Sequence, residues 1–273
     1  MPELKLQNRT AVVTGAASGI GRAIAVSLSR RGCHLALADI NQAQLAQTAK
    51  QAALAGVRTS LHLLDVADRQ AVASFPAVVM AEHGRVDVLI NNAGVALGGT
   101  FDQVSETDFE WLFEINFWGV VRMTRAFLPH LQASDDASLV NLSSLYGLIS
   151  PPGQAAYSAS KFAVRGFTQS IRHELEGSHV GVTVVHPGGV ATAIARNARI
   201  PKGLFSAEEE ARQRSAAEKL LRMPAEMAAE IIVQGIERRK PRVLIGMDAK
   251  IASFIERLAP VSYWKIFKRL KPR

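Results

Sequence analysis

Tyr157 and Lys161 lie four residues apart, a spacing that places a phenol and an ammonium on one face of a helix. An unperturbed tyrosine has a pKa of about 10, so roughly one in a thousand is ionised at neutral pH. A fixed cation lowers that pKa, and the phenol can then exchange a proton with an alcohol or carbonyl oxygen. Ser144, thirteen residues before Tyr157, would supply a second hydrogen bond to that oxygen. The pattern predicts acid/base chemistry, although Tyr-x-x-x-Lys also occurs on many inert helices.

A glycine-rich segment near the N-terminus predicts a phosphate-binding turn. Residues 11–13 form a short apolar run typical of a buried strand, Gly15, Gly19 and Gly21 follow, and a helical pattern covers residues 20–30. Glycines admit close backbone approach, and a helix N-terminus offers unpaired N–H groups to a pyrophosphate. The spacing is G-x-x-x-G-x-G rather than the commoner G-x-G-x-x-G, so a purely structural turn remains an alternative.

The second expected strand, residues 35–39, ends in Asp39, eighteen residues after Gly21. A carboxylate at this place can accept hydrogen bonds from the adenosine ribose hydroxyls, and it repels a 2′-phosphate. No basic residue precedes Gly19 in the turn, and Asn41 rather than a basic residue follows Asp39. These features favour NAD over NADP. Asp39 could also cap the next helix, and the two roles are compatible.

Two later apolar runs, residues 61–66 and 86–94, also end in polar, turn-forming residues. In open parallel sheets, ligands bind beyond the carboxyl ends of the strands. Asp65, Asn91, Ala93 and Gly94 are therefore candidates for the adenine and ribose edge of a nucleotide site.

Taken in order along residues 7–246, these elements closely resemble the short-chain dehydrogenase/reductase family. The matching segments are Thr14-Gly-Ala-Ala-Ser-Gly-Ile-Gly21, Asp39, Asp65-Val66, Asn91-Asn-Ala-Gly94, Asn116, Ser144, Tyr157-x-x-x-Lys161, and Pro187-Gly188 with Thr192. The resemblance implies that the following residues bind the cofactor: Gly15, Ser18, Gly19, Ile20, Gly21, Asp39, Asp65, Val66, Asn92, Ala93, Gly94, Tyr157, Lys161, Pro187, Gly188, Val190 and Thr192.

The same resemblance implies a catalytic role for four residues. Tyr157 would be the general acid/base, and Ser144 would orient the substrate oxygen. Lys161 would hold the nicotinamide ribose and lower the tyrosine pKa. Asn116 would anchor a water molecule that links Lys161 to solvent for proton relay.

The remaining implications concern the nicotinamide and the assembly. Gly188, Val190 and Thr192 would bracket the nicotinamide carboxamide, while the cofactor itself carries the hydride chemistry. A homo-tetramer or homo-dimer is expected, with the helices that contain Asn116 and Tyr157 as contact surfaces.

Length and composition predict one α/β domain. The chain has 273 residues, 48% of them hydrophobic, and strands alternate with helical stretches, which indicates a single Rossmann-like, doubly wound parallel β-sheet flanked by helices. We expect a catalytic and dinucleotide-binding domain over residues 1–246, with a substrate lid at about 193–224, and a helical C-terminal extension over 247–273.

The numbers and spacing of cysteine and histidine residues bear on disulfides, cellular location and metal binding. Cys33 is the only cysteine, so no intramolecular disulfide can form, and a reducing, cytoplasmic location is expected. The seven histidines show no metal-ligand spacing, so no metal is expected. Neither a signal peptide nor an 18-residue apolar run is recognised.

The positive charge is concentrated near the C-terminus. Residues 236–273 hold eleven Lys/Arg and three Asp/Glu, whereas the other residues hold 21 of each sign. A helix from Tyr263 would place its aromatic and aliphatic residues on one arc of about 160°, with Lys265, Lys268 and Arg269 opposite. This pattern suits a membrane surface through residues 260–273. The apolar face could instead pack on the protein's own core or on a neighbouring subunit; nucleic acid is not expected.

The expected substrate walls are mostly apolar. They comprise Val95, Ala96, Leu97, Leu145, Tyr146, Leu148, Ile149, Ile194, Ile200, Leu204 and Phe205. This favours NAD(H)-dependent interconversion of a hydrophobic secondary alcohol and a ketone. Arg196, Arg199 and Lys202 could meet an acidic group or face water. An NADPH-dependent 3-oxoacyl-thioester or carbonyl reductase is therefore an alternative, and a non-catalytic nucleotide-sensing or scaffold protein is an alternative of another class.

Overall fold

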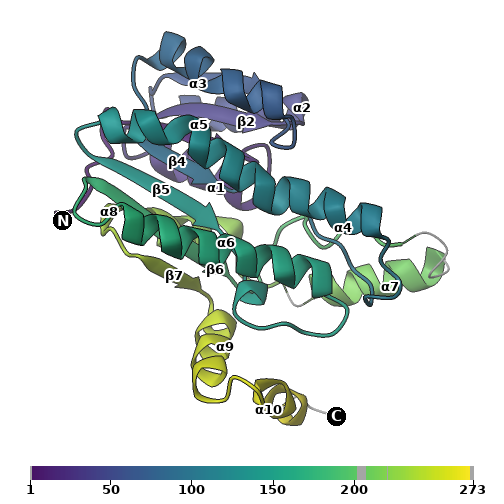
Figure 1. Ribbon diagram of the computed structural model, residues 1–273. Helices are drawn as coiled ribbons and strands as arrows, with labels where there is room; N and C mark the ends of the chain where they lie inside the picture. The colour runs from purple at the N-terminus through teal and green to yellow at the C-terminus, as the bar shows by residue number, and fades with distance from the viewer. Residues whose placement is uncertain (1, 202–206, 220, 271–273) are drawn as a thin grey trace.

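The computed structural model describes residues 2–201, 207–219 and 221–270. Seven parallel strands form one sheet in the order β3-β2-β1-β4-β5-β6-β7 (Figure 1). The strands are β1 (Thr10–Thr14), β2 (His34–Asp39), β3 (Thr59–Leu63), β4 (Val88–Asn91), β5 (Ala137–Leu142), β6 (Val180–Pro187) and β7 (Arg242–Ile245). The predicted Rossmann-like, doubly wound sheet is confirmed. Its order reverses between β1 and β4, which is where such sheets bind ligands.

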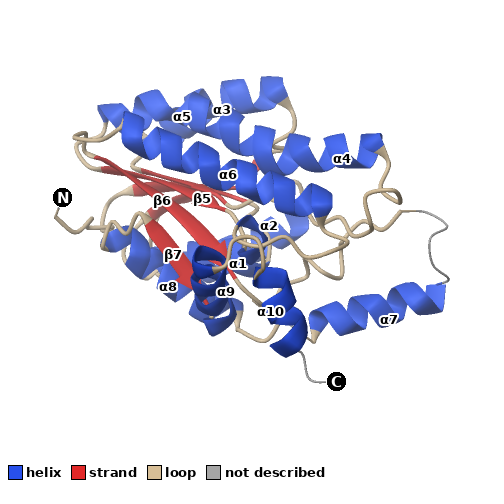
Figure 2. Ribbon diagram, turned by 60° about the horizontal axis from the view of Figure 1, so that its bottom comes forward, coloured by secondary structure: helices blue, strands red, loops and turns tan. Residues whose placement is uncertain are grey.

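Helices cover both faces of the sheet (Figure 2). One face carries α1 (Gly19–Ser29), α2 (Gln42–Ala53) and α8 (Ala225–Glu237), whose buried side chains form one hydrophobic cluster with the sheet. The other carries α3 (Arg69–His83), α5 (Gly119–Ala133) and α6 (Ala155–Glu174). Residues of β1 alternate between the two clusters, because successive side chains of a strand point to opposite faces. This is why β1 and β4 are buried along their whole length.

The remaining elements lie around the carboxyl ends of the strands. They are α4 (Glu106–Phe113), the π-helix η1 (Glu114–Trp118), the 3₁₀ turn η2 (Leu145–Gly147) and α7 (Ala207–Glu218). The last of these falls within the expected lid segment. Leu204 and Phe205, which were expected to line the pocket, lie outside the described residues, as does Lys202, which was expected to meet an acidic group or face water.

Two helices follow β7: α9 (Met247–Leu258) and α10 (Tyr263–Leu270). In Figure 1 they lie beyond the β7 edge of the sheet. The aromatic face of α10 is half-buried, and the Tyr263 hydroxyl accepts a hydrogen bond from the Ser150 N–H at 3.0 Å. This contact supports the alternative that the apolar face of α10 packs on its own chain. Among the described helices, none combines the length and apolar character needed to cross a membrane.

Candidate active site

The predicted catalytic side chains converge where β5 ends and α6 begins. Ser144 follows β5 and caps η2, its hydroxyl accepting a hydrogen bond from the Tyr146 N–H at 3.1 Å. Tyr157 and Lys161 occupy the first turns of α6, and Ser144 lies close enough to Tyr157 to favour its ionised form. The Lys161 ammonium lies 5.8 Å from the Tyr157 ring centroid and donates to the Leu142 carbonyl at 3.2 Å. The structure therefore brings a phenol, a hydroxyl and an ammonium into one buried place.

Burial dominates the ionisation of both titratable groups. It raises the pKa of Tyr157 to about 12, and the nearby Ser144 side chain only partly offsets the rise. It also lowers the pKa of Lys161 to about 8. The pKa of Tyr157 in the chain by itself is therefore raised rather than lowered as expected, because the loss of water around the phenol is the largest cause of its shift.

Asn116 lies in the π-helix between α4 and α5, an irregularity that often marks functional sites. Its side chain is fully buried and holds the backbone of Val95, accepting from the N–H at 2.8 Å and donating to the carbonyl at 3.0 Å. It also donates to Ser160 at 3.3 Å. A Cβ on Gly94 would lie 3.2 Å from the Asn116 Oδ1 and 3.4 Å from the Lys161 Nζ, so these three residues meet at one point.

The glycine turn lies directly against the tip of β4. The Asn92 side-chain amide donates to the carbonyls of Thr14 and Gly15, at 3.0 Å each. A Cβ on Gly21 would lie 2.1 Å from the Gly15 carbonyl oxygen, so a side chain there would push α1 off the turn. Gly15, with a φ of +63°, adopts a backbone conformation that favours glycine. The beginning of α1 is therefore held close to the sheet, as a pyrophosphate-binding turn requires.

Asp39 lies at the tip of β2 and contacts the same turn. Its carboxylate accepts from the N–H groups of Ala17 at 3.0 Å and Asn41 at 2.9 Å. Asn41, rather than Asp39, caps α2, through the Gln44 N–H. Asp39 therefore remains half-exposed beside the glycine turn.

Arg22 is a residue near this site that the sequence analysis missed. Its guanidinium folds back to donate to the carbonyl of Ala17, whose N–H donates to Asp39, and it also donates to the Thr48 hydroxyl at 3.0 Å. A cation thus binds the same residue, Ala17, as the carboxylate that was expected to exclude a 2′-phosphate. Its position directly after Gly21 in the sequence could have indicated a basic residue at the glycine turn.

The other expected cofactor residues line the same end of the sheet. Asp65 is exposed after β3, and Val66 is buried against Gly119. Pro187 ends β6, and Val190 is buried where its backbone bridges to Met223. A Cβ on Gly19 would lie 3.0 Å from the Thr192 side chain, which shows that the segment after β6 reaches the glycine turn. Ser18 is the N-cap residue of α1, and Ile20 follows in its first turn.

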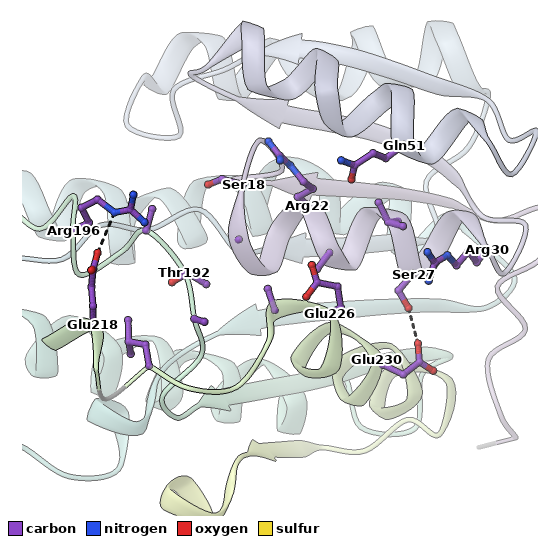
Figure 3. A pocket seen from close by; sticks show the side chains of 17 residues that line it. Ser18, Arg22, Ser27, Arg30, Gln51, Thr192, Arg196, Glu218, Glu226 and Glu230 are labelled. Atoms are coloured by element: carbon purple, nitrogen blue, oxygen red, sulfur yellow. Dashed lines mark hydrogen bonds and ion pairs between the residues drawn. The ribbon is translucent and has the colours of Figure 1, made fainter. Parts of the chain in front are cut away.

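A cavity of about 640 Å³ adjoins the glycine turn and lies between α1, α8 and residues 191–196 (Figure 3). Ser18, Gly19 and Thr192 belong to its lining, and Arg196 pairs with Glu218 at 3.0 Å across one end. At the other end, Ser27 donates to Glu230 at 3.0 Å. Within the described residues, no group of three or more His, Cys, Asp or Glu side chains could hold a metal ion.

The expected substrate wall is apolar where it is described. Tyr157 packs in a small hydrophobic cluster with Leu97 and Leu112, and Val95, Ala96 and Tyr146 lie against that cluster. Both arginines that were expected to meet an acidic group or face water form ion pairs within the chain. Arg199 stacks on the Trp111 ring at 3.6 Å and pairs with Asp108 at 2.7 Å, which fastens residues 96–98 and 199 to α4. Arg196 and Arg199 are therefore both engaged with carboxylates of the chain.

The buried ammonium generates a test of stability. The pKa of Lys161 is about 8 in the folded chain against an ordinary 10.5, so the cation destabilises the folded state at pH 7. Between pH 8 and 10.5 the unfolded chain binds more protons, so the wild type gains stability as the pH rises. We expect Lys161→Met to raise Tm at pH 7, by an amount that shrinks across this window. Thermal unfolding of this variant and of the exposed Lys50→Met control measures the effect; a lower Tm at pH 7 would contradict it.

Comparison with known proteins agrees with this geometry. A family model described as short chain dehydrogenase matches residues 9–202. A Mycobacterium tuberculosis protein named as the oxidoreductase SadH is 44% identical over 266 residues, a match that covers 95% of this chain and 94% of the relative. The 3-oxoacyl-acyl-carrier-protein reductase FabG of Thermotoga maritima is 31% identical, over 77% of this chain and 89% of its own.

Solved structures show the same relationship at the level of the fold. A short-chain dehydrogenase/reductase from Burkholderia phymatum in complex with NAD superposes with a TM-score of 0.84 at 28% identity, covering 99% of this chain and 98% of the other. A short-chain dehydrogenase from Mycobacterium paratuberculosis bound to NAD gives 0.77 at 25% identity, covering 90% of this chain and 100% of the other. The chain therefore belongs to the short-chain dehydrogenase/reductase family of oxidoreductases.

Proposed function

We propose that this protein interconverts a secondary alcohol and a ketone on a fairly hydrophobic small molecule, using NAD(H). The observation that carries the proposal is the pair of Ser144 and Tyr157 hydroxyls, in which Ser144 favours the ionised phenol, beside the buried Lys161 ammonium. The pair lies against an apolar cluster, so the substrate carbon skeleton would meet hydrophobic walls while its oxygen meets the two hydroxyls.

In this proposal the protein moves one proton and positions the reactants. Bound NAD would supply the hydride acceptor, and NADH the donor. The Tyr157 hydroxyl gives a proton to the substrate oxygen in reduction and, as phenolate, removes it in oxidation. Ser144 holds the same oxygen. Lys161 supplies the positive charge that favours the phenolate, because the alternative is an isolated anion in a dry site.

Asn116 has a positioning role in the same scheme. Its side-chain amide is occupied by Val95 and Ser160, so we assign it the task of holding the loop after β4 against Lys161. Any water relay at this residue would use its backbone within the π-helix rather than the side chain.

NAD is the cofactor that Asp39 favours, because its carboxylate would repel a 2′-phosphate. The two NAD complexes among the similar structures support this choice. The NADPH-dependent thioester reductase remains the alternative, and the FabG relative speaks for it. The ion pairs of Arg196 and Arg199 weigh against an acidic carrier at those residues.

The proposed reaction is tested with Tyr157→Phe. We expect turnover of hydrophobic secondary alcohols with NAD to fall about 10²- to 10⁴-fold, because the proton-transfer group is lost. NADH binding should persist, since the variant keeps the aromatic ring of residue 157 and loses only its hydroxyl. Absorbance of the reduced nicotinamide follows turnover, and NADH fluorescence measures binding. Equal turnover in wild type and variant would contradict the mechanism, and a biological role unchanged in the variant would favour a nucleotide-sensing protein.

Cofactor choice is tested at the two charges beside Ala17. Asp39→Ser removes the carboxylate that opposes a 2′-phosphate and leaves the Arg22 guanidinium, which binds the carbonyl of the same Ala17. We expect this variant to bind NADPH more tightly relative to NADH, by about tenfold or more. Adding Arg22→Gln should remove most of that gain. Kd values for both nucleotides measure the change, and NADPH preference in the wild type would reverse our assignment.

We further propose that α9 and α10 contact an anionic membrane surface. Met247, Ile251, Phe254 and Leu258 form an exposed apolar row along α9, at the spacing of one helix face. Exposed lysines and arginines accompany the row: Lys250, Arg257, Lys265, Lys268 and Arg269. This corrects the expected contact in one respect, because the apolar face of α10 is half-buried and the exposed row belongs to α9.

Vesicle co-sedimentation tests this surface. We expect the full chain to pellet with anionic vesicles and not with zwitterionic ones, and the Phe254→Ser/Leu258→Ser variant to lose most of the binding. Met227→Ser/Ile231→Ser, which removes two exposed apolar side chains from α8, is the matched control. Light scattering tests whether the exposed row of α9 binds a second copy of the chain rather than a membrane. A smaller assembly in the α9 variant than in the wild type would assign the row to a second copy. A homo-dimer or homo-tetramer through α5 and α6 remains our expectation for the wild type.

A further inference from the structure

Asp248, in the first turn of α9, contacts the backbone of the turn that follows β6. Its Oδ2 accepts a hydrogen bond from the Gly189 N–H at 2.6 Å. The neighbouring Gly188 N–H instead donates to the Ile245 carbonyl at 3.0 Å, which continues the pairing of β6 with β7. The last strand-to-strand hydrogen bond is therefore made by Gly188, and the N–H of the next residue, Gly189, bonds to the Asp248 carboxylate instead.

Two glycines leave the space that this carboxylate occupies. A Cβ on Gly188 would lie 2.1 Å from one Asp248 carboxylate oxygen and 2.3 Å from the other. A Cβ on Gly246 would lie 2.3 Å from the first of these oxygens, and Gly246 has a φ of +88° where the chain turns from β7 into α9. No larger residue fits at either position unless Asp248 moves, so the contact is built into the local backbone.

Residues 222–223, at the end of the expected lid, contact the other side of the segment that Asp248 holds, residues 188–192. The Gly189 carbonyl accepts from the Arg222 and Met223 N–H groups, at 2.9 and 3.0 Å. The Ala191 N–H donates to the Met223 carbonyl at 2.7 Å. Thr192 then meets Gly19 in the glycine turn. Residues 188–192 are thus held between α9 and residues 222–223, and their far end reaches the cofactor turn.

The segment after β7 reaches the substrate side of the site as well. The negative charge of Asp248, together with burial, raises the pKa of Tyr146, and the Tyr146 ring packs edge-on against Tyr157 with centroids 6.0 Å apart. Tyr263 of α10 accepts the Ser150 N–H, on the stretch of chain between Ser144 and Tyr157. Chain that follows β7 therefore acts on two residues, Tyr146 and Ser150, that lie between Ser144 and Tyr157 in the sequence.

We propose that Asp248 is a positioning residue whose carboxylate holds the Gly188–Gly189 backbone so that residues 188–192 bind the nicotinamide end of the cofactor. The inference rests on the proposed function, in which these residues meet the carboxamide. It makes α9 part of the catalytic unit, in contrast to the expected boundary at residue 246. The adenine end of the cofactor, at Asp39, lies outside the reach of this contact.

Ligand fragments distinguish this role from a general effect on folding. NADH carries the nicotinamide, whereas ADP-ribose ends before it. We expect Asp248→Ala to weaken NADH binding about tenfold or more, because a hydrogen bond to a charged group is lost, and to leave ADP-ribose binding unchanged. Asp248→Asn, whose amide oxygen can still accept from Gly189, should retain most of the NADH affinity. Glu256→Gln, which removes another carboxylate from α9, is the matched control. Calorimetry gives the Kd values, and thermal unfolding reports the fold.

Each other outcome has a definite meaning. Equal weakening of NADH and ADP-ribose together with a lower Tm would assign Asp248 a structural role only and overturn the inference. Unchanged NADH binding in Asp248→Ala would overturn it as well, while alcohol turnover by the wild type would leave the proposed function standing. A wild type that binds neither ligand would overturn both. If Asp248→Ala does not fold, Asp248→Ser takes its place with Asp248→Asn as the conservative control, and an unchanged ratio of the two affinities in Asp248→Ser would overturn the inference.

Discussion

The close contact between the glycine turn and the tip of β4 is the constraint on which the rest of the site depends. Gly21 has no side chain, so α1 begins directly against the Gly15 carbonyl, and the Asn92 amide joins that carbonyl to the neighbouring strand. This happens where the strand order reverses, the one place in such a sheet where the loops on either side diverge. The helix N-terminus, Asp39 and the loop after β4 all take their positions from this contact.

The residues proposed to be catalytic depend on a second constraint, which is the burial of their ionisable groups. Tyr157 and Lys161 are buried, and the loss of water shifts both pKa values toward the neutral forms. A surface pair at the same spacing would ionise as in water and would gain little from its neighbour. Burial therefore makes the ammonium and the Ser144 hydroxyl matter to the phenol, at the expense of stability.

Segments far apart in the chain close the site. Arg199 joins the first part of the expected lid to α4 through Trp111 and Asp108, and residues 222–223 join its end to Gly189. Asp248 then holds the same turn from the opposite side. The pocket is thus framed by short polar contacts between loops, while the apolar cluster around Leu97 and Leu112 supplies the wall. Because these contacts join loops, the loop residues that would face a substrate can change without altering the sheet.

The sequence by itself determined the elements and the chemical groups. Alternating apolar runs predicted the strands, their polar tips predicted the edge at which ligands bind, and the helical spacing of Tyr157 and Lys161 predicted their shared face, because each pattern is written in residues close together in the chain. Tertiary structure alone decided the partners: the fold-back of Arg22 toward Ala17, the grip of Asn116 on Val95, the ion pairs of Arg196 and Arg199, the half-buried face of α10, and Asp248 against Gly188. Those contacts join residues that are distant in sequence or free to turn several ways, and packing, not local spacing, selects among them.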